Sequence, residues 1–466
     1  MAITVTSVDD FTLYSRTKDG SVKRVPVSGT YSGAITGIQL QVRAYLTTDV
    51  IQEYRAVENL ILDGSNWSGY LSVPDGNGYS LIGQTLINGV VDATSSQTTT
   101  AFGVGIVGIH IGQSNASKMF QPYTAVVPNA NTSIWYRIGG WQIPVGDGAI
   151  NFLDRIETAT NTAVGFVDLS RPGTGLVDDV GSGEWLSEDG EVWQTFLEEF
   201  ALAGGDCEFV IWHGGEADAF GETTTKGQFM AGLDTLYARI QALTGRDTSQ
   251  LKFGVAQMAT LTFYGNDTVV NSVRSADEDW GTQTTGGFFA AACIDLVLDD
   301  GVHYDPPDSY VTLGDRYANA YLYQLELADA GSVGPRILSA SVDETTVTIA
   351  VRHDGGSGLT TTDGGTTGVG VTGFTFYDDD GVVAIDSTAY TGGDIVIELD
   401  RPVVGPLFLE YCAGQGPDIS NPVRDNYFLF GGTVGLPLLP EVQFSVYDGS
   451  GRRQEASMAT GTLLSA

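Results

Sequence analysis

The stretch "VGIHIGQSNASK", Val107–Lys118, joins an apolar run to a polar tip. Its apolar part continues backwards to give "VGIVGIHI", and an unbroken apolar run of this kind is typical of a strand covered on both faces. The tip consists of Gly112, Gln113, Ser114 and Asn115. A serine on a tight turn before a helix exposes its hydroxyl, and its own N–H points toward any anion that forms there. The tip therefore predicts either a nucleophilic serine or a serine that only caps the next helix.

Downstream of this stretch, apolar runs alternate with amphipathic segments. We expect helices at residues 191–203, 233–243, 268–280 and 313–330, and strands at 207–213, 252–261 and 291–300. Strands that alternate with helices predict a parallel sheet covered on both sides, that is, a three-layer α/β/α domain.

The flanking regions have a different pattern. Residues 20–92 alternate between apolar and polar side chains and are interrupted by Asp-Gly and Asn-Gly pairs, which are hairpin signals. Alternation returns after residue 334, with a long Gly/Thr-rich loop. We therefore expect an N-terminal β-sandwich over residues 1–100, the α/β domain over 101–332, a C-terminal β-sandwich over 333–440, and a tail over 441–466 that the pattern does not place.

Charge excludes several classes of partner. The 466 residues include 57 acidic and 22 basic side chains, for a net charge of −35. The negative electrostatic field of such a protein repels phosphate backbones and anionic lipid surfaces. We expect no nucleic-acid partner. No apolar stretch approaches the roughly 20 residues of a membrane span, and the N-terminus has no Sec-type signal pattern, so we expect neither membrane insertion nor Sec export.

The cysteines give no sign of a metal site or a disulfide framework. Cys207, Cys293 and Cys412 are few and scattered, with no CxxC pair or Cys/His cluster. Cys207 and Cys293 adjoin apolar runs, so we expect buried free thiols. No metal or other cofactor is expected.

Polar clusters follow three of the expected strands, and ligands gather at the carboxyl ends of the strands in an open parallel sheet. The clusters are "HIGQSN", "WHGGEADA" and "DDGVHYD". In the third, Asp300 and His303 are spaced i, i+3 on a turn, so the carboxylate can orient the imidazole as in a Ser-His-Asp triad. This pairing shifts the interpretation of Ser114 toward a nucleophile.

Three blocks of this sequence resemble the SGNH hydrolases: "GQSN", "WHGGEADA" and "DGVHYDPPDSYVTLGDRYA". More narrowly, they resemble the sialate O-acetylesterase branch, carbohydrate esterase family six. The resemblance covers about residues 103–330. It implies Ser114 as nucleophile, His303 as general base and Asp300 as its partner. It also implies an oxyanion hole with three donors: the nucleophile's N–H, a glycine N–H from a second block, and an amide side chain. The segment "VGFVDLSRPGTGL" resembles that second block, which makes Gly173 the first candidate for the glycine, ahead of Thr174.

One position departs from the family pattern. The resemblance calls for Gln before Gly-Glu, whereas this chain has Gly214. Loss of one oxyanion donor typically costs about 10²–10³ in rate. Either another group supplies the hydrogen bond, or the enzyme is slow, or catalysis has been lost. Asn115 and His213 are candidate replacements, and Gln113 belongs to the same group of oxyanion or substrate contacts. Glu216 and Asp218 are expected to hold the loop, to contact sugar hydroxyls or to be solvated.

Two hypotheses for function remain. In the first, the protein is a serine esterase that removes O-acetyl groups from a surface polysaccharide, as part of a phage-like spike or tail fibre. In the second, it is a non-catalytic glycan-binding spike or adhesin that retains the hydrolase fold. Both predict a homo-oligomeric or virion-associated protein at a virion or extracellular surface. Secretion by a non-Sec route is the alternative localisation.

Overall fold

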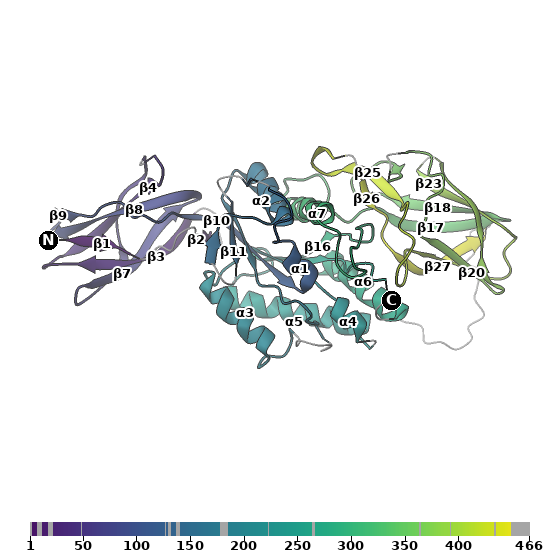
Figure 1. Ribbon diagram of the computed structural model, residues 1–466, viewed down its shortest axis with the longest axis horizontal. Coiled ribbons are helices and arrows are strands. Elements are labelled where there is room, and N and C mark those ends of the chain that lie inside the picture. Colours follow the sequence, from purple (N-terminus) through teal and green to yellow (C-terminus); the bar gives the residue numbers. More distant parts are fainter. Residues whose placement is uncertain are drawn as a thin grey trace.

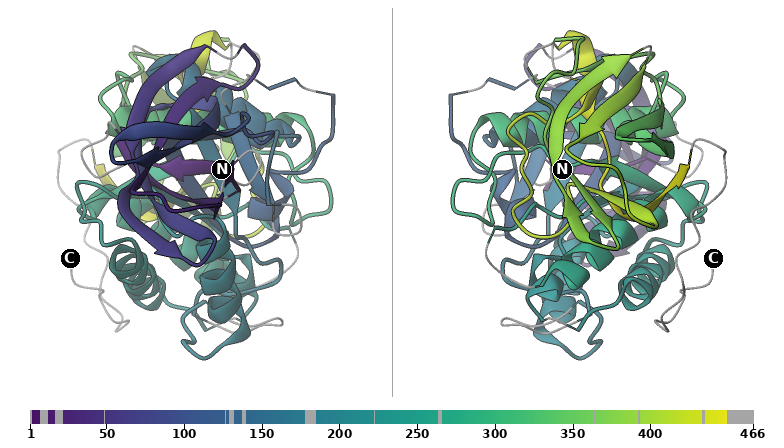
Figure 2. Two further views of the ribbon diagram at one scale, coloured as in Figure 1. Left: turned by 90° about the vertical axis from the view of Figure 1, so that its left-hand side faces the viewer. Right: turned by 90° about the vertical axis from the view of Figure 1, so that its right-hand side faces the viewer.

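The computed structural model describes residues 2–6, 12–16, 22–47, 49–125, 127–128, 132–136, 140–177, 185–221, 223–262, 266–362, 365–391, 393–432 and 435–448. The molecule is elongated, with a β-rich module at each end and a mixed α/β domain between them (Figure 1). Figure 2 views it along this long axis, with the N-terminal strands nearest the viewer in one panel and the C-terminal strands in the other.

The N-terminal module consists of two antiparallel layers that share one core. One layer has the order β1-β3-β7-β6, and in the other β4 pairs with β5 and β8, and β8 pairs with β9. The core holds Val25 and Leu71 from the first layer and Leu40 and Leu81 from the second, all fully buried. The strands are β1 (Ile3–Val5), β3 (Val22–Tyr31), β4 (Gly37–Ala44), β5 (Val50–Ala56), β6 (Glu58–Asp63), β7 (Asn66–Pro74), β8 (Gly76–Ile87) and β9 (Val90–Thr94).

A single strand, β10 (Phe102–Gly112), belongs both to this module and to the central domain. Its first residues pair with β2 (Thr12–Ser15) and β8. From Ile106 onward it pairs in parallel with β13 and β14. Every residue of β10 is buried, as the continuous apolar run predicts. The predicted boundary at residue 100 therefore falls just before a strand that the two units share.

The central sheet has the order β12-β11-β13-β10-β14-β15-β16 and is parallel except for β12 at its edge. Alternate residues of its strands enter two separate cores: Ile106 packs with α2 and α7 on one face, and Val107 with α3, α5 and α6 on the other. The predicted alternation of strands and helices is confirmed. The strands are β11 (Thr132–Tyr136), β12 (Gly140–Gln142), β13 (Val164–Asp168), β14 (Phe209–His213), β15 (Lys252–Ala256) and β16 (Gly287–Ala291). The helices are α1 (Ser114–Lys118), α2 (Asp147–Thr160), α3 (Glu191–Leu202), α4 (Glu216–Phe220), α5 (Lys226–Thr244), α6 (Asp267–Gln283) and α7 (Asp308–Gln324).

The last strand of this sheet lies earlier than the sequence pattern predicts. Residues 291–300 were expected to form it, but β16 ends at Ala291 and the chain then leaves the sheet. Asp295 is buried and pairs with Arg316 of α7 and Arg424 of the C-terminal module. A carboxylate needs such partners when it is buried, and these partners lie off the sheet, so the segment turns toward them. The strand expected over 252–261 likewise ends early, at Ala256.

The C-terminal module contains an eight-stranded sheet, a three-stranded sheet and one shared core. The larger sheet has the order β21-β20-β24-β27-β17-β18-β23-β22 and the smaller β19-β25-β26. Within the predicted tail, Glu441–Asp448 forms β27, which pairs with β24 and β17, so the boundary predicted at residue 440 excludes a strand of this sheet. Residues 449–466 lie outside the described part of the chain. The strands are β17 (Arg336–Asp343), β18 (Thr346–Arg352), β19 (Leu359–Thr360), β20 (Phe374–Asp378), β21 (Gly381–Val383), β22 (Ile385–Thr391), β23 (Asp394–Leu399), β24 (Leu407–Tyr411), β25 (Arg424–Phe428), β26 (Gly435–Pro437) and β27.

Within the described ranges, no helix is long and apolar enough to cross a membrane. Cys207, Cys293 and Cys412 are buried free thiols, as expected from the sequence for the first two.

Candidate active site

The turn after β10 places Ser114 at the carboxyl edge of the central sheet. Gly112 has a φ of +124°, and a Cβ at this position would lie 1.9 Å from the His213 carbonyl oxygen, so only glycine fits between the two strand ends. Ser114 then begins α1 and is half-buried. Its backbone N–H belongs to the first turn of the helix, where amide hydrogens have no intrahelical acceptor.

Ser114, His303 and Asp300 form a connected chain of hydrogen bonds. The Ser114 Oγ lies 2.9 Å from the His303 Nε2, and the His303 Nδ1 lies 2.6 Å from the Asp300 Oδ2. With Nδ1–H donating to the carboxylate, Nε2 is left as the acceptor for the serine proton. The structure thus brings together the three residues that the sequence predicted as a triad.

Asp300 is fixed by the backbone of its own turn. Its Oδ1 accepts hydrogen bonds from the N–H groups of Val302, at 3.0 Å, and His303, at 2.8 Å. Burial works to raise the pKa of Asp300, but the hydrogen bonds from the His303 side chain and from these two N–H groups outweigh it and hold that pKa well below its usual range. Asp300 is therefore a carboxylate at neutral pH and can stabilise a charged His303.

Asn115 joins the serine turn to the histidine turn, a role that the sequence analysis did not assign to it. Its Nδ2 donates to the Glu216 Oε1 at 2.8 Å and to the Val302 carbonyl at 3.0 Å. Its Oδ1 accepts from the Tyr304 N–H and the Tyr310 hydroxyl, both at 3.3 Å. Asn115 is fully buried and both of its amide hydrogens have acceptors, so the predicted role as an oxyanion donor is wrong.

Glu216 and Asp218 are both fully buried, which excludes the predicted contact with sugar hydroxyls and the solvated alternative. Burial raises the pKa of Glu216. Asp218 accepts hydrogen bonds from the N–H groups of Leu176, at 2.8 Å, and Val177, at 2.7 Å. Of the three expectations for these acids, the structure supports the one in which they hold the loops.

His213 is also unable to act as a replacement donor. Its Nε2 lies 3.0 Å from the Tyr304 hydroxyl and its Nδ1 lies 2.7 Å from the Tyr317 hydroxyl. Burial lowers the pKa of His213 to about 3, so the imidazole is neutral. No motif in the sequence pointed to Tyr304, Tyr310 or Tyr317, although the seven-residue spacing of the last two places them on one face of α7.

Gln113 keeps one side-chain group free. Its Oε1 accepts from the N–H groups of Gly215, at 3.4 Å, and Ala217, at 3.2 Å, at the start of α4. Its Nε2 makes no hydrogen bond within the described ranges. The Cγ of Gln113 lies 3.5 Å from where a Cβ would be at Gly214. The Gln113 side chain thus lies next to the position where the family glutamine is missing.

The loop after β13 reaches the same edge of the sheet. The Arg171 N–H donates to the Gly112 carbonyl at 2.8 Å, which ties this loop to the strand that carries Ser114. The Thr174 hydroxyl is turned inward and donates to the Arg171 carbonyl at 2.7 Å. Gly173 is exposed with a φ of +76°, whereas Thr174 is buried, so Gly173 is the better placed of the two to offer its N–H to a ligand.

Comparisons with known proteins relate part of the chain to a carbohydrate-esterase family. Residues 141–323 match the family described as carbohydrate esterase, sialic acid-specific acetylesterase. The resemblance to a carbohydrate-esterase family is confirmed. The matched segment includes Gly173, Gly214 and His303 and begins after Ser114.

Among solved structures, a carbohydrate acetylesterase from Xanthomonas citri is similar over 94% of this chain and 99% of its own, with a TM-score of 0.63 and 17% sequence identity, which shows a common fold. A protein from Arabidopsis thaliana covers 47% of this chain, and 97% of its own length, with a TM-score of 0.37 and 17% identity. A family two carbohydrate esterase from Cellvibrio japonicus covers 70% of this chain, and 99% of its own, with a TM-score of 0.33 and 10% identity. No curated protein sequence matches the chain.

The buried Glu216 carboxyl makes a pH-dependent contribution to stability. Its pKa is raised in the folded state, so the folded protein holds this proton more tightly than the unfolded chain, and stability falls as pH rises above the ordinary value of 4.5. We predict that Glu216→Gln, which keeps an oxygen for Asn115, gains stability relative to the native protein as pH rises from 4 to 7. Urea denaturation of both proteins at the two pH values measures this difference.

The control is Glu58→Gln, because Glu58 is an exposed acid on the N-terminal module, paired with Arg24. The same measurements on this variant give the background effect of removing an ion-paired surface carboxylate. A Glu216→Gln difference that is independent of pH would contradict the assignment of a raised pKa to this group.

Proposed function

We propose that the protein is a carbohydrate O-acetylesterase that acts on an acetylated surface polysaccharide through Ser114, His303 and Asp300. The observation that carries the proposal is the hydrogen-bond chain from the Ser114 Oγ through both nitrogens of His303 to Asp300. A non-catalytic glycan-binding protein with the same fold is the alternative, and it would have no need of this alignment.

The reaction follows from the positions of these groups. The Ser114 Oγ attacks the acetyl carbonyl carbon while its proton moves to the His303 Nε2, and the charged imidazole is stabilised by Asp300. His303 then gives the proton to the leaving sugar oxygen, which leaves an acetyl group on Ser114. Water attacks this ester with His303 again as base, and acetate departs as the serine is reprotonated. Ser114, His303 and Asp300 are unchanged at the end of the cycle.

The oxyanion of each tetrahedral intermediate needs preorganised donors. We assign two backbone donors, the N–H of Ser114 and the N–H of Gly173. For the third we assign the Gln113 Nε2, since Asn115 and His213 have no free hydrogen to donate. In this proposal Gln113 supplies the amide that the family places at the position of Gly214.

The flanking modules support a further part of the proposal, which is that the protein works at a virion or extracellular surface as a homo-oligomer or a particle component. The triad needs neither module. Edge strand β9 exposes Val90 and Val91 at 70% and 50%, and the β4–β5 turn exposes Leu46 at 89%, so the N-terminal module offers apolar surface for assembly. We propose a phage-like spike or tail fibre as the setting, and secretion by a non-Sec route is the alternative.

Ser114→Ala should abolish acetate release from an acetylated polysaccharide, with a loss of about 10⁴-fold or more in kcat, because the acyl-enzyme cannot form. His303→Ala should be about as damaging, since triad members act as a unit. Acetate release is measured enzymatically, and circular dichroism checks that both variants fold. Undiminished release by Ser114→Ala would contradict the triad.

Gly214→Gln should not raise the rate, because Gln113 already places an amide next to this position. A Cβ at Gly214 would lie 3.0 Å from the Trp212 Cζ2, so the indole ring would have to shift by a few tenths of an ångström, and 3.5 Å from the Gln113 Cγ, which is an ordinary van der Waals contact. Gly227→Gln is the matched control, since no atom lies within 4 Å of a Cβ there. Turnover of acetylated polysaccharide and the melting temperature are measured for both variants.

A second variant tests the Gln113 Nε2 donor without changing the packing around Gly214. Gln113→Glu keeps an oxygen for Gly215 and Ala217 but removes the Nε2 donor, and it should lower kcat by about 10²–10³. If Gly214→Gln instead raises kcat by such a factor, the third donor is missing in the native protein and its assignment to Gln113 is wrong.

Light scattering tests the assembly proposal. The full chain should run as a homo-oligomer, and Val90→Asp combined with Val91→Asp should shift it toward the monomer, because charges on an apolar contact face oppose its burial. A native protein that stays monomeric at all concentrations, and binds no virion or surface component, would contradict the proposal.

A further inference from the structure

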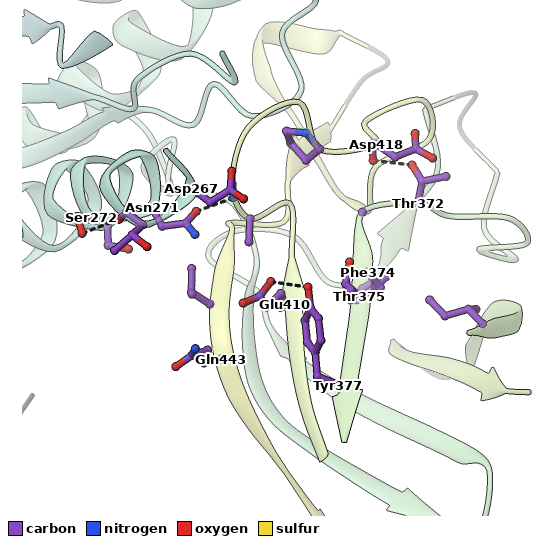
Figure 3. Close-up of a pocket in the computed structure, with 18 of the residues that line it drawn as sticks. Asp267, Asn271, Ser272, Thr372, Phe374, Thr375, Tyr377, Glu410, Asp418 and Gln443 are labelled. Atoms are coloured by element: carbon purple, nitrogen blue, oxygen red, sulfur yellow. Dashed lines mark hydrogen bonds between the residues drawn. The ribbon is translucent and has the colours of Figure 1, made fainter. Parts of the chain in front are cut away.

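A groove of about 880 Å³ lies between helix α6 of the central domain and the C-terminal sheet (Figure 3). Asn271 and Ser272 line it from the helix, and Thr375, Tyr377 and Glu410 line it from strands β20 and β24. None of the residues assigned to the triad or the oxyanion hole lines this groove. Its volume is in the range of ligand pockets.

The two walls of the groove are fixed to each other. The Asn271 Oδ1 accepts a hydrogen bond from the Gly414 N–H at 2.7 Å, and the Asp267 Oδ1 accepts one from the Gln415 N–H at 2.9 Å. Below them, the buried Arg274 donates to the Gly414 carbonyl at 2.7 Å. The groove is therefore preformed, and a ligand would not have to bring the two domains together.

The lining offers hydroxyl and amide groups that have no hydrogen-bond partner in the part of the chain that the structure describes. Within the described ranges, the hydroxyls of Ser275 and Thr375 and the side-chain amide of Gln443 make no hydrogen bonds. Because the Asn271 Oδ1 is used by Gly414, its Nδ2 remains as a donor. The Tyr377 ring lies on the same wall and is held by its hydroxyl, which donates to the Glu410 Oε2 at 3.3 Å. Mixed donors and acceptors around an aromatic ring suit a sugar, which has hydroxyls on its edge and C–H groups on its faces.

The charges on the groove select against an anionic ligand. Asp267, Glu410 and Asp418 contribute carboxylates. The cation that lines the groove within the described ranges, Lys226, is paired with Asp279 at 2.5 Å. Together with the net charge of −35, this arrangement disfavours uronic or sialic acid units.

Contacts connect the groove with the catalytic turn. The Gly416 N–H donates to the Leu261 carbonyl at 2.7 Å, and the Thr262 N–H donates to the Gly301 carbonyl at 3.0 Å. The loop that leads from β15 toward α6 thus touches both the C-terminal wall of the groove and the turn that holds Asp300 and His303. In a parallel sheet the start of α6 and the start of α1 lie at the same edge, so one extended polymer can reach both places.

We propose that this groove is a second carbohydrate site, which binds an uncharged stretch of polysaccharide next to the esterase centre. The choice of a polysaccharide ligand rests on the proposed function, whereas binding itself does not require Ser114 to be catalytic. The groove holds the polymer, and the triad acts on acetyl groups presented nearby.

Binding is measured with the full chain by affinity gel electrophoresis against chemically deacetylated arabinoxylan, glucomannan and mixed-linkage β-glucan, with polygalacturonate as the anionic comparison. Deacetylated polymers carry no ester for Ser114 to attack, so slower migration of the protein in the gel measures binding without hydrolysis. We expect retardation by at least one neutral polymer and none by polygalacturonate. Tyr377→Ala should weaken binding about tenfold, which corresponds to about 1.4 kcal/mol. Thr375→Arg, which fills the groove, should do at least as much.

Tyr70→Ala is the matched control, because Tyr70 is an exposed tyrosine, at 41%, on the N-terminal module. Hydrolysis of p-nitrophenyl acetate is measured alongside, and it should stay unchanged in Tyr377→Ala. Retention of polymer binding by both groove variants, or binding of none of the neutral polymers, would overturn the proposal. If the groove variants lose binding while the native protein hydrolyses no acetyl ester, the groove stands and the esterase proposal fails.

Discussion

The backbone pairing of β10 is the constraint on which the rest of the molecule depends. This strand pairs with β2 and β8 at its start and with β13 and β14 from Ile106 onward, and all of its residues are buried. A buried strand must satisfy its N–H and C=O groups on both edges, so β10 fixes the N-terminal module to the central sheet without a flexible linker. The same strand ends in Gly112, whose contact with the His213 carbonyl sets the direction in which Ser114 projects.

The hydrogen-bond chain of Ser114, His303 and Asp300 is then held in place by buried side chains. Asn115 hydrogen-bonds to Glu216, to the Val302 carbonyl and to the Tyr304 N–H, so one buried amide joins the strand end of β14 to the turn that holds Asp300 and His303. Buried polar networks of this kind specify one geometry because each unsatisfied member would be costly. The 2.9 Å contact between Ser114 and His303 therefore follows from the scaffold.

The sequence predicts that Ser114, His303 and Asp300 lie together because its signals are local. One signal is a glycine and a serine at the end of an apolar run, and the other is an acid three residues before a histidine. Each depends on the geometry of only a few neighbouring residues. The roles of Asn115, His213, Glu216 and Asp218 depend instead on which loops pack over them, which spacing in the chain does not encode. The last strand was misplaced for a similar reason: the strand predicted at 291–300 starts where β16 ends, and the partners of Asp295 off the sheet, Arg316 and Arg424, are distant in sequence. The groove beside α6 could not be predicted from the sequence because its walls come from two domains.

Labelling with a fluorophosphonate probe tests whether Ser114 is a nucleophile activated by His303. The probe reacts covalently with an activated serine and requires no knowledge of the glycan. If His303 activates Ser114, peptide mass spectrometry finds one label, on Ser114, in the native protein. The His303→Ala variant then reacts far more slowly, and Ser114→Ala carries no label. A native protein that remains unlabelled, or is labelled elsewhere with Ser114 free, would contradict this role of Ser114.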